Sequence, residues 1–289
     1  MKYGVYYAYW ENEWATSFEK YIQKVKKLGF DVLEVAALGL VNLSNEQLEH
    51  LNYLAKEQQI SLTAGIGIPQ EYDISSPNKE TREKGLQFMK NILNKLEIAG
   101  IDRIGGTVYS YWPVDYSQPF DKEEVRKYSI ASVKELADYA KQKGITLLIE
   151  TLNRFEQFLI NDVEEALVFV REVDKENVQI MLDTFHMNIE EDSIPDAIRK
   201  AGEHLGHLHI GEGNRKVPGQ GNLNWQEIGD ALKDIHYDGF IVMEPFVKMG
   251  GQVGKDIKVW RDLSKNASEA QLDQEIKQSL TFVKSMFRR

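Results

Sequence analysis

Cysteine is absent from all 289 residues of this chain. Its absence excludes disulfides, thiolate metal sites and a cysteine nucleophile, and it favours the cytoplasm, where disulfides are rare. The first ten residues have neither the apolar segment nor the cleavage site of a signal peptide. No apolar run approaches the roughly 18 residues that a membrane span needs. We therefore expect a cytoplasmic protein with no membrane partner.

Basic residues are outnumbered, with 35 Lys and Arg against 45 Asp and Glu, which gives a formal net charge of −10. No block of Lys and Arg is long enough to form a basic arm. Because affinity for phosphate backbones is mostly electrostatic, nucleic acid is excluded as a partner. The remaining composition, 42% hydrophobic and 28% charged, is typical of a globular protein.

Apolar segments that read as strands alternate with amphipathic segments along the whole chain. We predict strands over residues 2–9, 30–37, 60–66, 103–109, 145–150, 178–183, 206–210 and 239–244. Helices are predicted to follow them over residues 17–28, 45–58, 78–99, 122–143, 162–173, 194–205, 225–235 and 268–289. Eight such units predict a closed α/β barrel, the (β/α)₈ TIM barrel, as a single domain over residues 1–289. An open doubly wound sheet usually carries a Gly-rich phosphate loop after its first strand, and none is present.

Polar residues end the last four predicted strands: Glu150, Asp183, His209 and Glu244. Active sites of such barrels lie at the carboxyl ends of the strands, and neighbouring strands would bring these four side chains together. Three converging carboxylates repel one another, and a divalent cation removes that conflict. Three oxygen ligands and one imidazole suit Mn²⁺, Mg²⁺ or Co²⁺. The alternative is that each residue is a solitary strand-end side chain bonded to a loop amide.

Other polar residues near these strand ends have two interpretations each. His207 and His209 point the same way from one strand; we predict His209 as the ligand and His207 as hydrogen-bonded one layer below. His186, three residues beyond the sixth strand, contacts substrate from the following loop or has no role. Glu156 either joins the site or forms a salt bridge with Arg154.

Five aromatic residues near the predicted barrel mouth exceed what loops normally expose: Tyr6, Trp14, Tyr109, Tyr111 and Trp112. Aromatic faces pack well on the C–H faces of sugars, whereas a core role would place these rings at alternating strand positions. Arg215 and Lys216 lie in a Gly-rich loop after the seventh strand, where a plain solvated charge pair is the alternative. Gly105 and Gly106, inside the fourth predicted strand, indicate close approach of two backbones.

A cation flanked by two glutamates fits proton abstraction beside a carbonyl. If Glu150 and Glu244 lie on opposite faces of a bound sugar, one removes a carbon-bound proton and the other returns one, which inverts that carbon. This geometry predicts epimerisation, whereas a single base that moves a proton between two carbons would give aldose–ketose isomerisation. General acid–base steps of this kind contribute ~10²–10⁴-fold each.

Several longer motifs carry a family resemblance that extends over essentially the whole chain. They are Tyr-Tyr-Ala-Tyr-Trp (6–10), Tyr-Ser-Tyr-Trp-Pro (109–113), Glu-Thr-Leu-Asn-Arg-Phe-Glu (150–156), Met-Leu-Asp-Thr-Phe-His-Met-Asn-Ile-Glu-Glu-Asp (181–192), His-Leu-His-Ile-Gly-Glu (207–212), Asn-Arg-Lys-Val-Pro-Gly (214–219) and Met-Glu-Pro-Phe (243–246). With them the chain resembles the ketose 3-epimerases, the group of D-tagatose 3-epimerase and D-psicose (allulose) 3-epimerase within the xylose-isomerase-like barrels.

This resemblance implies roles for the residues that match its motifs. One Mn²⁺ or Co²⁺, with Mg²⁺ as an alternative, would be bound by Glu150, Asp183, His209 and Glu244, and the two glutamates would also form the acid–base pair. The O1 to O3 end of the sugar would be held by Glu156, His186 and Arg215. The rest of the pocket would be lined by Tyr6, Trp14, Ile66, Trp112 and Phe246.

The resemblance also implies a substrate class and an assembly. The expected reaction is epimerisation at C3 of a free ketose, such as D-fructose and D-psicose, D-tagatose and D-sorbose, or L-ribulose and L-xylulose, through a cis-enediolate. A homodimer or homotetramer is expected, which fits the long segment 247–265 beyond the last strand. The match is weaker over residues 38–43 and 65–73, which follow the second and third strands and should face the far end of the sugar.

Three rival functions follow from the same residues. An aldose–ketose or hydroxypyruvate-type isomerase would use the same barrel and metal. A metal-dependent phosphodiesterase of the endonuclease IV type would need more strand-end histidines and a basic groove, which the net charge of −10 opposes. A non-catalytic sugar-binding barrel would have no use for two glutamates placed for proton transfer.

Overall fold

Eight strands form the centre of the computed structural model, which describes residues 1–15, 17–117 and 119–287. They are β1 Lys2–Tyr6, β2 Val32–Ala36, β3 Ser61–Ile68, β4 Arg103–Tyr111, β5 Thr146–Glu150, β6 Val178–Asp183, β7 Leu205–Ile210 and β8 Phe240–Met243. Each strand pairs in parallel with the next in sequence, and β8 pairs with β1 to close the ring. The predicted (β/α)₈ barrel is therefore confirmed.

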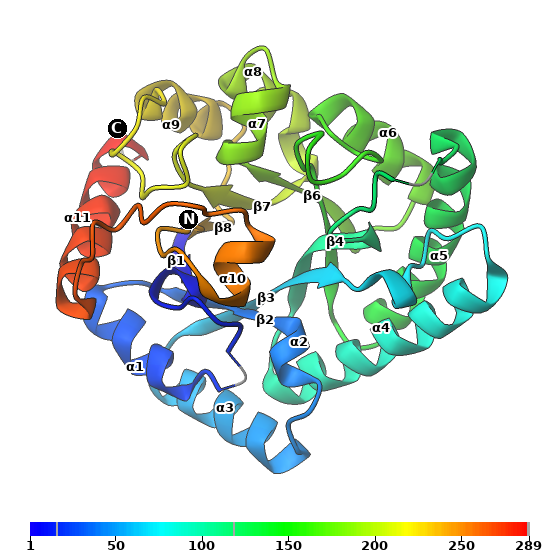
Figure 1. Cartoon of the computed structure of the whole chain (residues 1–289), viewed down its shortest axis with the longest axis horizontal. Coiled ribbons are helices and arrows are strands. Elements are labelled where there is room, and N and C mark those ends of the chain that lie inside the picture. Colours follow the sequence, from blue (N-terminus) through cyan, green and yellow to red (C-terminus); the bar gives the residue numbers. More distant parts are fainter. Residues whose placement is uncertain (16, 118, 288–289) are drawn as a thin grey trace.

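Helices surround this barrel, as Figure 1 shows. They are α1 Glu19–Leu28, α2 Ala37–Leu40, α3 Asn45–Glu57, α4 Lys79–Ala99, α5 Lys122–Lys141, α6 Val163–Val173, α7 Thr184–Glu190, α8 Ile194–Ala201, α9 Trp225–Asp234, α10 Gly251–Asp256 and α11 Glu269–Phe287, with short 3₁₀ helices η1 Tyr7–Trp10, η2 Gln70–Tyr72 and η3 Gly202–His204. Local sequence determines several of their ends: Ser44 and Gln47 form a capping box that begins α3, and Gly29 and Gly100 end α1 and α4 in the left-handed conformation.

Strand register places polar residues of neighbouring strands at the same level of the barrel. The Cα of Asp183 on β6 pairs with that of His209 on β7. Glu34 on β2 is flanked by Tyr6 on β1 and by Thr63 on β3. Because the strands are parallel, side chains at equal levels and on the same face meet at one height.

The first strand is shorter than predicted, because residues 7–10 form η1 instead of continuing the ladder. All four side chains of η1 are buried. Tyr7 packs edge-on against Phe18 with ring centroids 5.0 Å apart, and the Tyr9 hydroxyl donates a hydrogen bond of 2.6 Å to Glu275. Because the chain turns here, these aromatic side chains pack under α1 and α11. In a continued strand they would extend past the end of the sheet.

Three short helices were not predicted: α2, α7 and α10. The predicted loop after the sixth strand is α7, in which the Asp183 side chain accepts a hydrogen bond of 2.8 Å from the Phe185 amide as N-cap. His186 therefore lies on a helix, and the prediction of a loop was wrong. The predicted eighth helix is α11, and its last two residues, 288 and 289, lie outside the described part of the chain.

A close contact between backbones occurs at Gly106, as predicted. Gly106 has φ of 102°, and a Cβ there would lie 2.1 Å from the carbonyl oxygen of Ile66 on the adjacent strand. Only glycine fits such a position. Over the described ranges, none of the helices combines the length and the apolar character that crossing a membrane requires.

Candidate active site

The four strand-end residues predicted as metal ligands lie together at one end of the barrel. Glu150 and Asp183 are the last residues of β5 and β6, His209 is the penultimate residue of β7, and Glu244 directly follows β8. Glu150, Asp183 and His209 are buried, and Glu244 is partly exposed. The order of the strands around the barrel thus brings residues 94 positions apart in sequence to one place.

Distances among these four side chains are those of a coordination cluster. His209 Nδ1 lies 3.5 Å from Glu244 Oε1 and 3.9 Å from Glu150 Oε1. Ligand atoms of Asp183, His209 and Glu244 all lie within 4.8 Å of one another, and so do those of Glu150, Asp183 and His186. Asp183 belongs to both sets and His209 approaches both glutamates, so the four predicted ligands form one continuous cluster.

Two atoms of this cluster are buried without a hydrogen-bond partner among the described residues: Asp183 Oδ2 and His209 Nδ1. Burial raises the pKa of Glu150 well above its usual range, and the nearby charges of Glu244 and Asp183 raise it further, against the opposing effect of His209. Buried polar atoms normally have partners, and repelling carboxylates normally have a counter-charge. A divalent cation supplies both, so the donor set fits such an ion.

Beneath the cluster lies Glu34, a buried residue of β2 that was not among the predicted site residues. Its Oε1 is 2.6 Å from His209 Nε2. Burial by itself would raise the pKa of Glu34, but the charges of His209 and His207 outweigh it and hold that pKa well below its usual range. Conversely, Glu34 and Glu244 outweigh burial and raise the pKa of His209 well above its usual range. The signal in the sequence was a lone charge inside the apolar run 32–36.

His207 lies fully buried inside the barrel next to His209, as predicted. Its Nε2 lies 3.1 Å from Glu34 Oε2, in an ion-pair contact with that carboxylate. Burial lowers the pKa of His207 despite the nearby carboxylate of Glu34.

His186 on α7 presents one defined ring nitrogen to the cluster. The backbone amide of Asn153 donates a hydrogen bond of 3.1 Å to His186 Nδ1. Since Nδ1 accepts, a neutral ring carries its hydrogen on Nε2, which lies 3.8 Å from Asp183 Oδ2. Burial is the largest cause that lowers the pKa of His186, which favours this neutral form. The arrangement suits a hydrogen-bond donor to a substrate oxygen.

Arg215 connects the cluster to Glu156. Its guanidinium lies 3.3 Å from Glu244 Oε2, 3.5 Å from Asp183 Oδ2 and 3.4 Å from Glu156 Oε1, and it stacks 3.6 Å from the centre of the Phe185 ring. Although burial opposes it, the charges of His186 and Arg215 lower the pKa of Glu156.

The alternative salt bridge between Arg154 and Glu156 does not form. Arg154 instead pairs with Glu190, with a shortest distance of 2.7 Å. Glu156 consequently points to the cavity side, where Trp112 Nε1 donates a hydrogen bond to it at 3.3 Å.

All eight residues predicted to bind substrate line one cavity of about 560 Å³, together with Glu150, His209 and Glu244: Tyr6, Trp14, Ile66, Trp112, Glu156, His186, Arg215 and Phe246. Charged groups are concentrated near the cluster. Aromatic and aliphatic groups make most of the rest, including Leu38 and Pro69 from the two segments, 38–43 and 65–73, that were expected to face the far end of the sugar.

Two of the five aromatic residues that were predicted at the mouth have other surroundings. Tyr109 is fully buried and donates a hydrogen bond of 2.9 Å to the backbone oxygen of Glu150, so for this residue the core interpretation was correct. The Tyr111 hydroxyl accepts a hydrogen bond of 3.3 Å from the Asp115 amide in the following loop.

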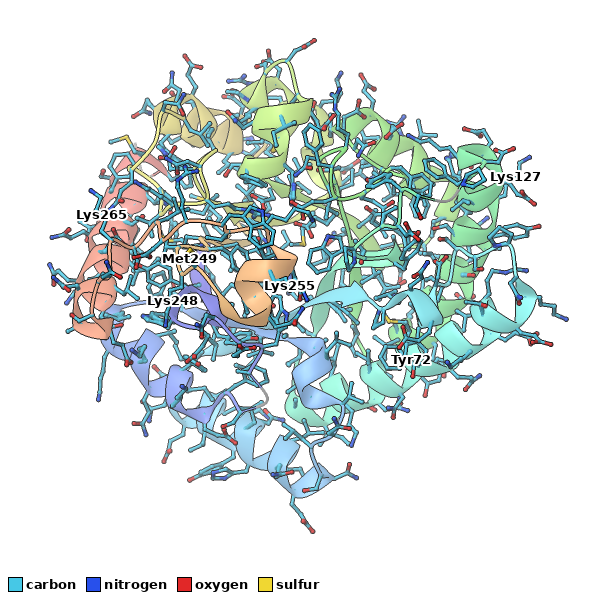
Figure 2. All side chains as sticks on the ribbon, in the orientation of Figure 1. Tyr72, Lys127, Lys248, Met249, Lys255 and Lys265 are labelled. Carbon is cyan, nitrogen blue, oxygen red and sulfur yellow. The ribbon has the colours of Figure 1, made fainter. Side chains whose placement is uncertain are left out.

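One wall of the cavity comes from α10, which lies over the middle of the barrel in Figure 1 (orange) and carries Lys255, labelled in Figure 2. Asp256 and Ile257 from this segment line the cavity. Trp14 donates a hydrogen bond of 2.7 Å from its indole nitrogen to Asp256, and the Val253 amide donates one of 3.0 Å to the Asn12 oxygen. Because its N–H is bound, Trp14 offers a sugar only its ring. No local pattern in the chain indicated this wall.

Comparison with known proteins places this geometry among sugar-converting barrels. The family model of the xylose isomerase-like TIM barrel matches residues 22–265. The chain is 51% identical over 282 residues to the D-psicose 3-epimerase of Ruminiclostridium cellulolyticum, covering 98% of this chain and 96% of that one. It is 32% identical over 270 residues to the L-ribulose 3-epimerase of a Methylomonas strain, covering 91% of each.

Solved structures agree with the sequence matches. The crystal structure of D-psicose 3-epimerase with D-tagatose from Clostridium cellulolyticum H10 superposes with a TM-score of 0.98 at 50% identity, and covers 99% of both chains. A D-allulose 3-epimerase from a Methylomonas strain, in complex with D-allulose, superposes with a TM-score of 0.89 at 30% identity over 99% of this chain and 97% of that one.

Proposed function

Because this chain belongs to the xylose isomerase-like TIM barrels and, within them, to the ketose 3-epimerases, we propose that it interconverts D-fructose and D-psicose by epimerisation at C3. Relatives that are about half identical are D-psicose 3-epimerases. More distant ones act as L-ribulose 3-epimerases, so D-tagatose and L-ribulose are the next substrates to test.

The observation that carries this proposal is the placement of two glutamates around one coordination cluster. Glu150 and Glu244 come from β5 and β8, and both approach the same nitrogen of His209. Each carboxylate has two oxygens, so one can hold a cation while the other exchanges a proton with substrate. Two such groups on opposite faces of a ketose can remove a proton from C3 and deliver another on the other side.

In the proposed site, Glu150, Asp183, His209 and Glu244 would hold one Mn²⁺ or Co²⁺. When bound, this ion would act as a Lewis acid that stabilises the negative charge of the enediolate. The raised pKa of Glu150 suits a group that exchanges a proton with substrate.

The remaining groups of this chain would orient the ketose. The Nε2–H of His186 and the guanidinium of Arg215 would donate hydrogen bonds to sugar oxygens at the O1 to O3 end, and Glu156 would accept one from a hydroxyl. The apolar part of the cavity would exclude water from the carbanion-like carbon and pack on the C–H face of the sugar. The second glutamate would then deliver its own proton to the opposite face of C3 before a water molecule can protonate that carbon directly.

The rival is an isomerase on the same barrel, and a product assay in D₂O separates the two. With D-fructose and Mn²⁺, we expect D-psicose as the product, with one solvent deuteron at C3. Glucose or mannose as the product, with deuterium at C1 or C2, would instead identify an aldose–ketose isomerase. The same assay over D-tagatose and L-ribulose would rank the substrates by kcat/KM.

We further propose that the chain forms a homodimer or homotetramer through the segment 247–265. This segment exposes two large apolar side chains, Trp260 at 70% and Met249 at 51% of their surface, and Figure 2 labels Met249. Exposed apolar surface of this kind is typical of protein interfaces. Light scattering should give two or four times the mass of one chain, and Trp260→Glu should lower it; a monomeric wild type would contradict the proposal.

A further inference from the structure

A buried polar group lies directly below the coordination cluster, and apart from His209 its residues have no role in the proposed reaction. It consists of Glu34 on β2, Thr63 on β3 and the two histidines of β7, His207 and His209. Glu34 is 2% exposed, Thr63 1% and His207 0%. Buried polar residues of this kind are costly unless they are satisfied, so their retention inside a barrel needs a physical reason.

Hydrogen bonds define the orientation of His209 within this group. A carboxylate only accepts, so the contact of 2.6 Å between His209 Nε2 and Glu34 Oε1 places the imidazole hydrogen on Nε2. Thr63 Oγ1 donates a second hydrogen bond, of 2.8 Å, to Glu34 Oε2. The carboxylate is thereby held from both sides in one rotamer.

The other nitrogen of His209 faces the coordination cluster. Nδ1 is buried, has no hydrogen-bond partner among the described residues, and points to the carboxylates of Glu150 and Glu244 at 3.9 and 3.5 Å. A neutral imidazole with its hydrogen on Nε2 is the form that binds a cation through Nδ1. Its hydrogen bond to a carboxylate also makes the lone pair on Nδ1 more basic.

A second cation is the alternative explanation, because ligand atoms of Glu34, His207 and His209 also lie within 4.8 Å of one another. The distances oppose it. Two ligand atoms bound at about 2.1 Å and at right angles to one ion lie about 3 Å apart. The separation of 2.6 Å between Glu34 and His209 is shorter and is that of a hydrogen bond.

We propose that Glu34 is a positioning residue, which, held by Thr63, fixes the ring hydrogen of His209 on Nε2 and aims Nδ1 at the divalent cation. This inference rests on the proposed function, since it assigns Glu34 to the same metal. Glu34 does not contact substrate, and its effect is exerted through His209 alone. Replacement of Glu34 should therefore lower the affinity of the protein for the metal.

The test is a titration of the metal-free protein with Mn²⁺, followed by the electron paramagnetic resonance signal of the free ion. Glu34→Gln keeps the shape of the side chain and removes its charge. It should raise the Kd for Mn²⁺ about 10- to 100-fold. Thr63→Val removes only the hydroxyl that orients Glu34, and should raise that Kd about fivefold. Since Thr63→Val is nearly isosteric, it keeps the inference testable if Glu34→Gln fails to fold.

Asp73→Asn is the matched control, because Asp73 is also a buried acid but accepts its hydrogen bonds from the amide and hydroxyl of Ser75. Its Kd for Mn²⁺ should stay within about twofold of wild type, as for a distant site. A second readout is the visible spectrum of bound Co²⁺, which reports the ligand field: it should shift in Glu34→Gln and not in Asp73→Asn.

Each possible outcome supports or overturns the role proposed for Glu34. A Kd for Glu34→Gln within twofold of wild type, in a protein that circular dichroism shows to be folded, would overturn the role of Glu34 while leaving the epimerase proposal intact. Two Mn²⁺ per wild-type chain, with one lost in the variant, would make the group a metal site itself and overturn the inference. No Mn²⁺ binding by wild type would refute the proposed metal chemistry, and this inference with it.

Discussion

Replacing either Glu150 or Glu244 by glutamine is expected to lower kcat for ketose epimerisation by about 10²–10⁴-fold. Glutamine keeps the volume and one oxygen ligand of each side chain but cannot exchange a proton. Both positions are needed, because inversion at C3 requires removal of a proton from one face and delivery to the other. Sugar binding should partly survive, since the residues expected to hold the ketose are unchanged.

Solvent exchange distinguishes a two-base mechanism from a general loss of the site. In D₂O, each variant retains one glutamate that faces one side of C3. It should therefore still exchange the C3 hydrogen of one ketose epimer without forming the other, and the two variants should select opposite epimers. Nuclear magnetic resonance of D-fructose and D-psicose, incubated separately, would show this selectivity.

Glu172→Gln is a suitable control for these variants. Glu172 lies on α6 in the outer layer, where it pairs with Arg126 at 2.6 Å, and its replacement should leave kcat unchanged. More than a tenth of the wild-type kcat in either Glu150→Gln or Glu244→Gln would contradict the two-base mechanism.

The part of this site that sequence alone predicts is the part that lies at strand ends. Once eight strand–helix units are recognised, parallel strands and barrel closure bring Glu150, Asp183, His209 and Glu244 to one rim, whatever the detailed register. Short runs such as 178–183 locate these ends to within a residue, because the apolar pattern stops where the strand leaves the core. The chain order of strands and polar strand ends is therefore sufficient to predict these four residues.

The parts of the site that the sequence did not predict depend on contacts between residues far apart in the chain, which no local pattern indicates. Glu34 lies in the middle of β2 and meets His209 of β7 across the barrel interior, 175 residues away. The helix that carries His186 begins directly after its N-cap Asp183, a residue that was assigned from the sequence only to the metal. The wall formed by α10 is positioned by hydrogen bonds to the loop after η1, such as that from Trp14 to Asp256. Propensity over a few residues is too weak to predict such short helices.

Removing divalent metal by chelation is expected to abolish epimerisation, and added Mn²⁺ or Co²⁺ should restore it. Without a cation, Asp183 Oδ2 and His209 Nδ1 have no hydrogen-bond partner among the described residues, and the enediolate would lose its Lewis acid. The core, in which all eight strands take part, does not depend on the rim, so circular dichroism should show a folded barrel after chelation. Full activity after exhaustive EDTA treatment would remove the metal from the mechanism.

The binding of Mn²⁺ or Co²⁺ that restores activity should also depend on pH. In the metal-free protein the pKa values of His209 and Glu150 are both raised, so both groups keep their protons to higher pH than usual, and an incoming cation must displace those protons. Metal affinity should therefore fall as pH decreases and rise as pH increases. Calorimetric titration with Mn²⁺ at several pH values, in buffers of different ionisation enthalpy, should show proton release on binding. Binding that is independent of pH and releases no protons would mean that the ion does not bind at Glu150 and His209.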